Sequence, residues 1–312
     1  MNTGITAIEY TLGEEHLSLL SLEEQRLLDS PAEQLQEFGF AFCHVSRRSA
    51  ASLAKECAQR LLEKHSIDPE SIDLLIYAGA LTCNHSIGER SGLMANFIYP
   101  ATALHDSMGL VNANAYGVSQ TGCGSMMTAI HCATDFLQAN AGAKRVLVVG
   151  ADVLPRESNR EIFYSLISDG ACALLVEKNA PQNRIVAQRQ KTKGFYWDCE
   201  KRKFELIAAY FPTARAIIQE LLHEEGLRPQ ELRHIVPHNV SLRSWQILMG
   251  LCQLPKELLF SENIAPIGHV VAADNFINLK DLEDRNALIA DDLVLLFNFG
   301  FGANWSCLLL QR

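Results

Sequence analysis

The chain has 312 residues, 48% of them apolar and 20% charged, a composition that excludes disordered, collagen-like and coiled-coil proteins. Its 27 basic and 36 acidic residues give a net charge of −9, so neither nucleic-acid nor membrane-surface binding is expected. The first residues show no signal-peptide pattern and no apolar run reaches the length of a membrane span, so we expect a cytoplasmic protein.

Nine cysteines are scattered along the chain, and no two of them form a Cys-x-x-Cys pair. This spacing argues against zinc knuckles and thioredoxin-like sites, and reduced cytosolic thiols are the simplest interpretation. His234 and His238 lie four residues apart in a segment that reads as a strand, so they do not share a face as two metal ligands on a helix would. We expect no metal site.

Apolar periodicity predicts alternating helices and strands in chain order. A helix is expected over residues 50–64, and a strand begins at Ile72. A second helix follows Cys123, and a second strand begins at Arg145. This alternation is typical of an α/β fold with buried strands.

Two parts of the chain repeat one another. Five positions match at one constant offset: Ile67, Pro69, Ile72, Leu75 and Ile76 against Leu227, Pro229, Leu232, Ile235 and Val236. The strand that begins at Gly170 is echoed by the C-terminal segment. We predict two similar α/β halves, residues 1–180 and 205–312, the second opening with a helix from about Thr213 to Glu224. The alternative is coincidence, because a proline between a helix and a strand is common.

Residues 181–204 are expected to connect the two halves. This region departs from the acidic character of the chain, because residues 178–203 include eight basic residues and only two acidic ones. The basic residues are Lys178, Arg184, Arg189, Lys191, Lys193, Lys201, Arg202 and Lys203. Such a run is either a solvated loop or a docking surface for an acidic partner or a phosphate-bearing ligand.

Cys123 is the strongest single candidate for chemistry. It lies between Gly122 and Gly124, directly before an amphipathic helix. The glycines permit a tight turn, and the unpaired N–H groups at a helix start favour a thiolate. A thiolate in this position is suited to forming an acyl-enzyme. Taken alone, the motif also fits a small buried cysteine in a glycine turn.

Three further segments bear on the same chemistry. The segment VPHNVSLR places His238 and Asn239 on a turn between a strand and a helix. Gly268 and His269 lead through small residues into another helix. The segment FGFGANWS forms a glycine turn between two strands, where backbone N–H groups could face a ligand or simply close a hairpin.

In combination, these segments resemble the thiolase-fold condensing enzymes, specifically β-ketoacyl-[acyl-carrier-protein] synthase III. The resemblance spans almost the whole chain and implies two duplicated α/β halves whose sheets enclose buried helices. It also implies Cys123 as the acylated nucleophile and His238 as a histidine that polarises the thioester. At the family's asparagine position, this chain has His269.

The resemblance further implies an oxyanion hole formed by the backbone N–H groups of Cys123 and Phe301. Phe301 departs from the small residue usual in the family. Arg243 and Asn239 are expected to contact the substrate. The segment between the strand from Gly170 and the helix before His238 is shorter than in the family, so no acyl-chain preference is carried over.

The implied function is transfer of an acyl group from acyl-CoA or acyl carrier protein to the cysteine, then decarboxylative condensation with a malonyl thioester. The exchange of asparagine for a histidine leaves open an acyltransferase that acylates a hydroxyl or amine, because histidine can accept a proton. A noncatalytic partner subunit is a third possibility. The resemblance implies no permanently bound cofactor, since the CoA or phosphopantetheine thioester is a substrate, and it implies a homodimer.

Overall fold

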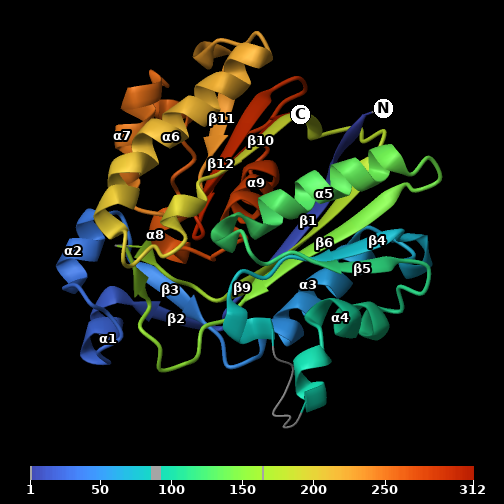
Figure 1. The fold of residues 1–312 in the computed structure, drawn as a ribbon, viewed down its shortest axis with the longest axis horizontal. Coiled ribbons are helices and arrows are strands. Elements are labelled where there is room, and N and C mark those ends of the chain that lie inside the picture. The colour runs from blue at the N-terminus through green and yellow to red at the C-terminus, as the bar shows by residue number, and fades with distance from the viewer. Residues whose placement is uncertain (1, 86–92, 164) are drawn as a thin grey trace.

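The computed structural model describes residues 2–85, 93–163 and 165–312 (Figure 1). Its centre is a nine-stranded sheet in the order β11-β12-β13-β10-β1-β9-β6-β4-β5. The nine strands are β1 (Thr3–Leu12), β4 (Leu74–Tyr77), β5 (Asn114–Gly117), β6 (Arg145–Asp152), β9 (Gly170–Lys178), β10 (Arg184–Thr192), β11 (Leu232–Val236), β12 (Leu293–Gly300) and β13 (Asn304–Gln311). Two small two-stranded sheets pair β2 (Glu15–Ser18) with β3 (Phe42–Val45) and β7 (Glu161–Ile162) with β8 (Ser165–Leu166).

Helices cover the sheet on both faces (Figure 1). They are α1 (Leu19–Glu24), α2 (Ala32–Glu37), α3 (Ala50–Lys64), α4 (Pro100–Met108), α5 (Ser125–Ala139), α6 (Lys203–Glu224), α7 (Leu242–Cys252), α8 (Ile264–Ile267) and α9 (Asp274–Asp284). Within the described ranges, no helix is long and apolar enough to cross a membrane.

The strand pairing repeats itself. In one half of the sheet, β1 pairs antiparallel with β9, β9 antiparallel with β6, and β6 parallel with β4. In the other half, β10, β13, β12 and β11 pair in the same sequence of directions. The two halves are joined where β1 meets β10, through the single paired position Gly4–Arg184. The repeat in pairing agrees with the repeat in sequence, and the boundaries assigned to the halves stay a prediction.

Alternate residues of the strands enter different apolar layers, as the period of two along a strand requires. In β6, Val146 and Val148 join the cluster that contains α5 and α9, whereas Leu147 and Val149 pack with α3 and α4. The strands of the other half divide likewise between α5 and α9 on one side and α6 and α7 on the other. Helices α5 and α9 therefore lie inside the molecule, and the expectation of sheets enclosing buried helices is confirmed.

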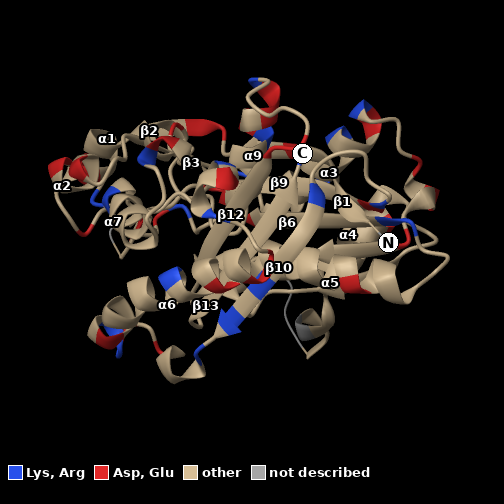
Figure 2. Ribbon diagram, turned by 90° about the horizontal axis from the view of Figure 1, so that it is seen from above, with Lys and Arg blue, Asp and Glu red and all other residues tan. Residues whose placement is uncertain are grey.

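Two expectations need correction. Helix α6 begins at Lys203, ten residues before the expected start, because it continues through Pro212. Proline lacks an N–H and normally interrupts a helix, which is why the sequence suggested a start at Thr213. Residues 181–204 are also more than a connecting segment, because β10 lies there and pairs with β13 along its length. Figure 2 shows the basic positions of β10 as blue segments of its ribbon.

Candidate active site

Cys123 lies in a short 3-10 turn, Gly122–Gly124, directly before helix α5. Gly122 has a φ of +55°, and a Cβ there would come within 2.6 Å of the backbone nitrogen of Phe301. A Cβ on Gly300 would come within 1.9 Å of the Thr121 carbonyl oxygen. The two turns therefore touch through backbone alone, which requires glycine at both positions. This contact brings together the two turns predicted to donate to an oxyanion.

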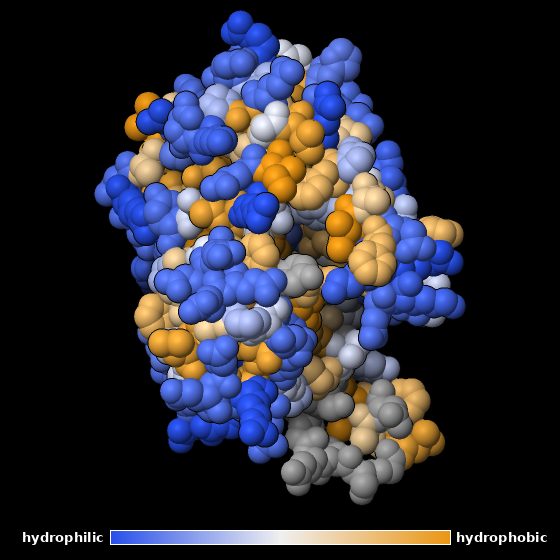
Figure 3. All heavy atoms as spheres, turned by 90° about the vertical axis from the view of Figure 1, so that its left-hand side faces the viewer, coloured by the Kyte–Doolittle hydropathy of each residue, from blue (hydrophilic) through white to orange (hydrophobic). Residues whose placement is uncertain are grey.

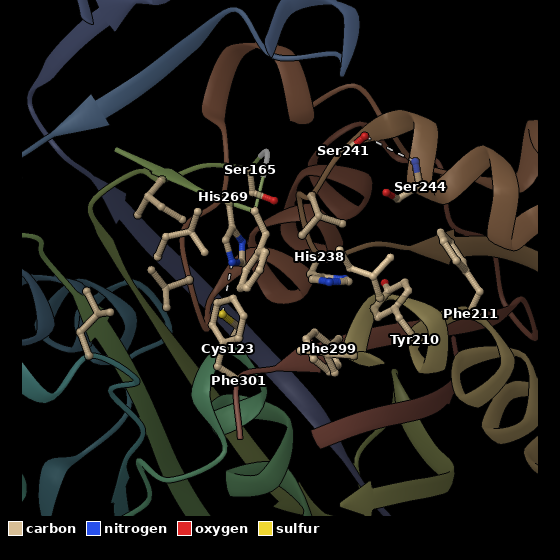
Figure 4. Close-up of a pocket in the computed structure, with 18 of the residues that line it drawn as sticks. Cys123, Ser165, Tyr210, Phe211, His238, Ser241, Ser244, His269, Phe299 and Phe301 are labelled. Atoms are coloured by element: carbon tan, nitrogen blue, oxygen red, sulfur yellow. Dashed lines mark hydrogen bonds between the residues drawn. The ribbon is translucent and has the colours of Figure 1, made fainter. Parts of the chain in front are cut away.

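His269 faces Cys123 from the other half of the molecule. Its Nε2 lies 3.3 Å from the Cys123 Sγ, and Figure 4 shows the two side chains pointing toward one another. The main chain of His269 is held on both sides: its N–H donates to Leu166 and its carbonyl accepts from Ser168. A fixed backbone and a short contact to sulfur suit a group that exchanges a proton with the thiol.

Asp274 completes this arrangement, and the sequence analysis missed it. Its Oδ2 lies 2.5 Å from His269 Nδ1 and also accepts the backbone N–H of Asn239 at 2.6 Å. Its Oδ1 accepts the N–H of Val270 at 2.6 Å. The carboxylate is fully buried and ordered by these two N–H donors. It fixes which ring nitrogen of His269 carries a proton, so Nε2 is left to serve the thiol.

His238 occupies a different environment in the same site. Its ring packs edge-to-face against Trp245, Phe297 and His269, with ring centres 5.8, 6.0 and 6.2 Å away. Its backbone carbonyl accepts the Trp245 indole N–H at 2.9 Å. His238 is thus beside the pair of Cys123 and His269, surrounded mainly by aromatic rings.

The two histidines have opposite charge preferences. Burial, helped by the nearby His269, lowers the pKa of His238 to about 3, so this ring stays neutral. Burial also opposes a charge on His269, but Asp274 and the Cys123 sulfur outweigh it and raise the pKa of His269 well above its usual value. The site therefore stabilises the imidazolium that forms when His269 takes a proton from the Cys123 thiol, which its Nε2 faces.

Seven other cysteines in the described ranges are less suited to react, because their thiol pKa values are raised. Cys83 is exposed and Cys132 half-buried, and burial raises the pKa of both thiols. Burial likewise raises the pKa of five deeper cysteines, Cys43, Cys57, Cys172, Cys252 and Cys307.

Across the described residues, no group of three potential ligands could hold a metal ion.

A cavity of about 280 Å³ opens onto Cys123, His238 and His269. Its wall is mostly apolar and includes five aromatic side chains, namely Phe163, Tyr210, Phe211, Phe299 and Phe301. Helix α6 supplies one side of the cavity, and Figure 3 shows a hollow bordered by apolar side chains on the face that α6 and α7 cover. Such a cavity suits an apolar ligand held next to a few polar groups.

The side chain of Phe301 lines the cavity, and its backbone lies against Gly122. Its ring lies 5.2 Å from that of Phe163, at the tip of the β7–β8 hairpin. Because Phe163 and Phe301 both line the cavity, the large residue in the turn narrows the space near Cys123. This is the physical consequence of having phenylalanine where a small residue was expected.

Comparisons with known proteins agree with this arrangement. The family model described as 3-oxoacyl-[acyl-carrier-protein] synthase III matches residues 119–194, and the model of its C-terminal part matches residues 222–312. Together they cover more than half of the chain, including the cysteine turn and both histidines. The chain belongs to the 3-oxoacyl-[acyl-carrier-protein] synthase III family. The family resemblance inferred from the motifs is confirmed.

Individual synthase III relatives align over most or all of the chain. The β-ketoacyl-[acyl-carrier-protein] synthase III of Aquifex aeolicus is 25% identical over 271 residues, 83% of each chain. That of Listeria innocua is 23% identical and covers 100% of this chain and 99% of its own. The solved Aquifex aeolicus structure superposes with a TM-score of 0.84 at 23% identity, covering 99% of this chain and all of its own. The acyltransferase ChlB3 has a TM-score of 0.85 at 19% identity, covering 100% and 98%.

The two residues predicted to bind substrate in this synthase III relative, Asn239 and Arg243, lie in different positions relative to the cavity. The Asn239 side chain is fully buried and outside the cavity wall, donating to the Gly268 carbonyl and accepting from Asn278. The expectation that its side chain contacts substrate is therefore corrected: its partners are protein groups. Arg243 is exposed on the first turn of α7, next to Ser244, which lines the cavity. Its role stays a prediction.

Proposed function

We propose that this chain is an acyltransferase that forms an acyl thioester on Cys123 and passes the acyl group to a hydroxyl or amine acceptor. The observation that carries the proposal is the chain of contacts from Cys123 through His269 to Asp274. A nucleophile, a base and a carboxylate that orients the base form the common arrangement for nucleophilic acyl transfer. The similarity in fold to the acyltransferase ChlB3 is compatible with this assignment.

In the first half-reaction, the Cys123 proton moves to His269 Nε2, and the thiolate attacks the thioester carbonyl carbon of acyl-CoA or an acyl carrier protein. The backbone N–H groups of Cys123 and Phe301 stabilise the resulting oxyanion. Losing one such donor typically slows a reaction by about 10²–10³. The bond from carbon to the leaving sulfur then breaks, and His269 returns the proton to that sulfur.

In the second half-reaction, neutral His269 accepts the proton of the incoming hydroxyl or amine. The acceptor oxygen or nitrogen attacks the acyl carbon, and the bond to Cys123 breaks. The same proton then returns from His269 to the cysteine sulfur. Asp274 stabilises the imidazolium formed in each half-reaction, while its own charge is held by backbone N–H donors.

Decarboxylative condensation with a malonyl thioester is the second candidate. The specific observation in its favour is His238, whose ring centre lies 6.2 Å from that of His269. Two histidines at this separation could both donate to the carbonyl of a malonyl unit as carbon dioxide leaves. The names of the synthase III relatives also favour this reaction. It requires His269 to act as a donor, whereas its contact with Cys123 favours proton exchange with sulfur.

The first experiment is mass spectrometry of the intact protein after incubation with a series of acyl-CoA thioesters. We expect one acyl adduct, located on Cys123 and absent in Cys123→Ala. We also expect iodoacetamide to alkylate Cys123 before exposed Cys83, although Cys123 is only 8% exposed. Preferential alkylation of Cys83, with no acyl adduct from any donor, would remove both enzymatic candidates and leave a noncatalytic partner subunit.

The second experiment separates the two reactions in the isolated acyl-enzyme. Its discharge by alcohols or amines is compared with its discharge by malonyl-CoA, with release of carbon dioxide as the marker of condensation. His269→Asn removes the proton acceptor but keeps a donor. We expect it to abolish transfer to alcohols and amines. If wild type releases carbon dioxide and His269→Asn retains that reaction, condensation is the correct assignment.

We propose that the donor arrives on an acidic carrier protein that contacts the basic start of α6. Lys201 and Lys203 precede Leu206 and Ile207, which line the cavity. Exposed aromatic residues border these lysines, with Trp197 at 74% and Phe204 at 83% exposure. Basic groups around an opening accelerate encounter with an acidic partner, and salt weakens the effect.

Lys201→Glu with Lys203→Glu tests this docking. We expect the KM for a carrier-bound donor to rise several-fold at low salt, with a smaller rise at high salt and an unchanged KM for a short free thioester. The matched control, Lys55→Glu with Lys144→Glu, makes the same change of charge on α3 and before β6. Equal KM values for both double variants at low salt would exclude this surface.

We propose that the chain forms a homodimer through β5, the strand at the edge of the sheet. Apolar side chains nearby are exposed, including Tyr116 on the strand and Val111, Phe97 and Tyr99 before it. An unpaired strand edge with apolar neighbours is a common site of association. Light scattering should give twice the chain mass for wild type, and Val111→Asp with Tyr116→Asp should lower it. A wild-type mass equal to one chain at micromolar concentration excludes the dimer.

A further inference from the structure

Helix α9 carries polar side chains along one face although the helix lies inside the molecule. Asp274, Asn278 and Asp281 follow one another at intervals of four and three residues, so they share a face. Asp274 and Asn278 are fully buried. Burying an amide or a carboxylate is costly unless it is hydrogen-bonded, so these side chains need defined partners.

Asn278 has partners for all of its principal hydrogen-bonding groups. Its Nδ2 donates to the Pro237 carbonyl at 2.9 Å and to Asn239 Oδ1 at 2.8 Å. Its Oδ1 accepts from Asn263 Nδ2 at 2.9 Å. Pro237 and Asn239 are the residues on either side of His238. One amide group on α9 therefore holds both flanks of the turn that carries this histidine.

The network continues from that turn to the second histidine. Asn239 Nδ2 donates to the Gly268 carbonyl at 2.9 Å, and Gly268 directly precedes His269. The backbone N–H of Asn239 donates to Asp274, which contacts the His269 ring. The orientation of Asn239 thus bears on His269 through both the main chain and the carboxylate.

The other end of the network reaches the opposite half of the sheet. Asn263 Nδ2 also donates to Asp281 Oδ2 at 2.7 Å, and the Tyr10 hydroxyl donates to Asp281 Oδ1 at 2.9 Å. Tyr10 lies on β1, which pairs with β9 in the half that supplies Cys123. The network therefore ties the histidine-bearing segments to the half that bears the cysteine.

We infer that Asn278 is a positioning residue, which joins the His238 turn to the His269 loop and thereby keeps His269 within reach of Cys123. The expected effect of Asn278 on turnover rests on the proposed function. Its expected effect on the contact between Cys123 and His269 does not. A displacement of about 1 Å at a reacting group can lower a rate by about 10²-fold. A single buried amide is therefore sufficient to control this site without touching substrate.

The test compares Asn278→Ala with Asn275→Ala in the full chain. Asn275 is the matched control because it is on the same helix, fully buried, and donates two hydrogen bonds of 3.0 Å, to the Val236 and Phe297 carbonyls. Its donated hydrogen bonds go to strands β11 and β12, so its loss leaves the hydrogen bonds that join Pro237, Asn239 and Gly268 intact. Both substitutions should lower the melting temperature, since each removes three buried hydrogen bonds, two donated and one accepted.

The distinguishing measurement is the rate of Cys123 alkylation by iodoacetamide between pH 5 and 9, read by mass spectrometry. The titratable groups around the thiol are His269 and His238, with Asp274 behind His269 and Tyr210 on the cavity wall. For Asn278→Ala, we expect alkylation at pH 7 to fall about tenfold and its midpoint to move to higher pH, because His269 holds the thiolate less well. For Asn275→Ala, we expect the wild-type profile.

Turnover provides the second readout. We expect Asn278→Ala to lower kcat by about 10²-fold, with KM for the donor within about threefold of wild type. Asn278→Ser keeps one short donor and should give intermediate values, and it replaces the alanine variant if that variant does not fold. A wild-type alkylation profile in both Asn278 variants, or equal changes in Asn275→Ala, would overturn the inference. Failure of wild type to form any acyl adduct would instead overturn the proposed function.

Discussion

The turn that carries His238 and the loop that carries His269 place the same side chain in opposite surroundings. The turn encloses its imidazole with Trp245 and Phe297, and the ring stays neutral because burial lowers its pKa to about 3. The loop offers its imidazole a buried carboxylate, and the pKa of His269 rises despite equal burial. Burial alone does not decide the charge of a histidine in this site; the neighbouring carboxylate does.

The two imidazole rings are therefore suited to different roles. A neutral ring that cannot easily gain a proton is suited to hydrogen bonding and to shaping a cavity. A ring held between a carboxylate and a thiol is suited to carrying a proton back and forth. Changes that make the two surroundings more alike, or that remove one of them, test whether this division holds.

Asp274→Asn should have the largest effect, because it deprives His269 of its charge and leaves two similarly neutral histidines. In a related arrangement of nucleophile, histidine and aspartate, this exchange costs about 10⁴ in rate, and we expect a loss of about 10³–10⁴ in acyl transfer here. Stopped-flow acylation and alkylation of Cys123 at pH 7 should both slow. Transfer within tenfold of wild type would show that the carboxylate does not support catalysis.

His238→Phe should have a smaller effect on the same reaction. Phenylalanine keeps the edge-to-face packing against Trp245 and Phe297, and His238 is not on the path of the proton. We expect about tenfold slower transfer to alcohols or amines, a barrier change of about 1.4 kcal/mol. A loss as large as that of Asp274→Asn, measured in the same assay, would place both histidines on the reaction path and favour condensation.

The same substitution should alter how stability depends on pH. An unfolded histidine has a pKa of about 6.5, whereas His238 in the folded chain titrates near 3. Between these values the unfolded chain binds the proton and the folded chain does not, so His238 lowers stability as pH falls from 6.5 toward 3. His269 acts in the opposite sense, because its raised pKa adds stability at low pH that is lost as pH rises through its folded value.

Urea unfolding at several pH values between 4 and 8 measures this dependence. We expect His238→Phe to lose less stability than wild type on acidification, so the two curves should diverge below pH 6.5. Circular dichroism before addition of urea confirms that both proteins begin folded. Parallel curves would mean that His238 is protonated in the folded chain.

The smallest expected effect belongs to Trp245→Phe. This change keeps an aromatic ring beside His238 but removes the indole N–H that donates to the His238 carbonyl. Loss of one such hydrogen bond costs about 1 kcal/mol of stability, and acyl transfer should stay within about threefold of wild type. A rate loss comparable to that of His238→Phe would show that the turn depends on the indole for its position.

Much of the site could be predicted from sequence because its signals are local. Glycines beside Cys123 and the position of His238 after a strand identify turns without any tertiary information. Asp274 could not be found this way. An acidic residue in the first turn of a helix is usual for reasons of helix capping and dipole alone, and its contact with His269 becomes visible only when the loop is folded back.

The remaining differences have similar causes. Asn239 was expected to contact the substrate. Its side chain instead bonds to the Gly268 carbonyl and to Asn278, both distant in sequence, because a turn can direct successive side chains to opposite sides. Strand β10 is polar and basic along much of its length, so it lacks the apolar alternation that marked the other strands. The strand forms nevertheless because its backbone pairs with β13, and this hydrogen bonding does not require an apolar sequence.

The single paired position that joins the two halves of the sheet has a consequence for how the protein unfolds. Backbone pairing joins them at one position, yet α5 from one half and α9 from the other belong to a single apolar cluster. Neither half retains a covered surface once the other has melted, because each would expose a buried helix face to water. Calorimetry should therefore record one cooperative transition, with loss of Cys123 reactivity at its midpoint, and separately expressed halves should require one another to become soluble.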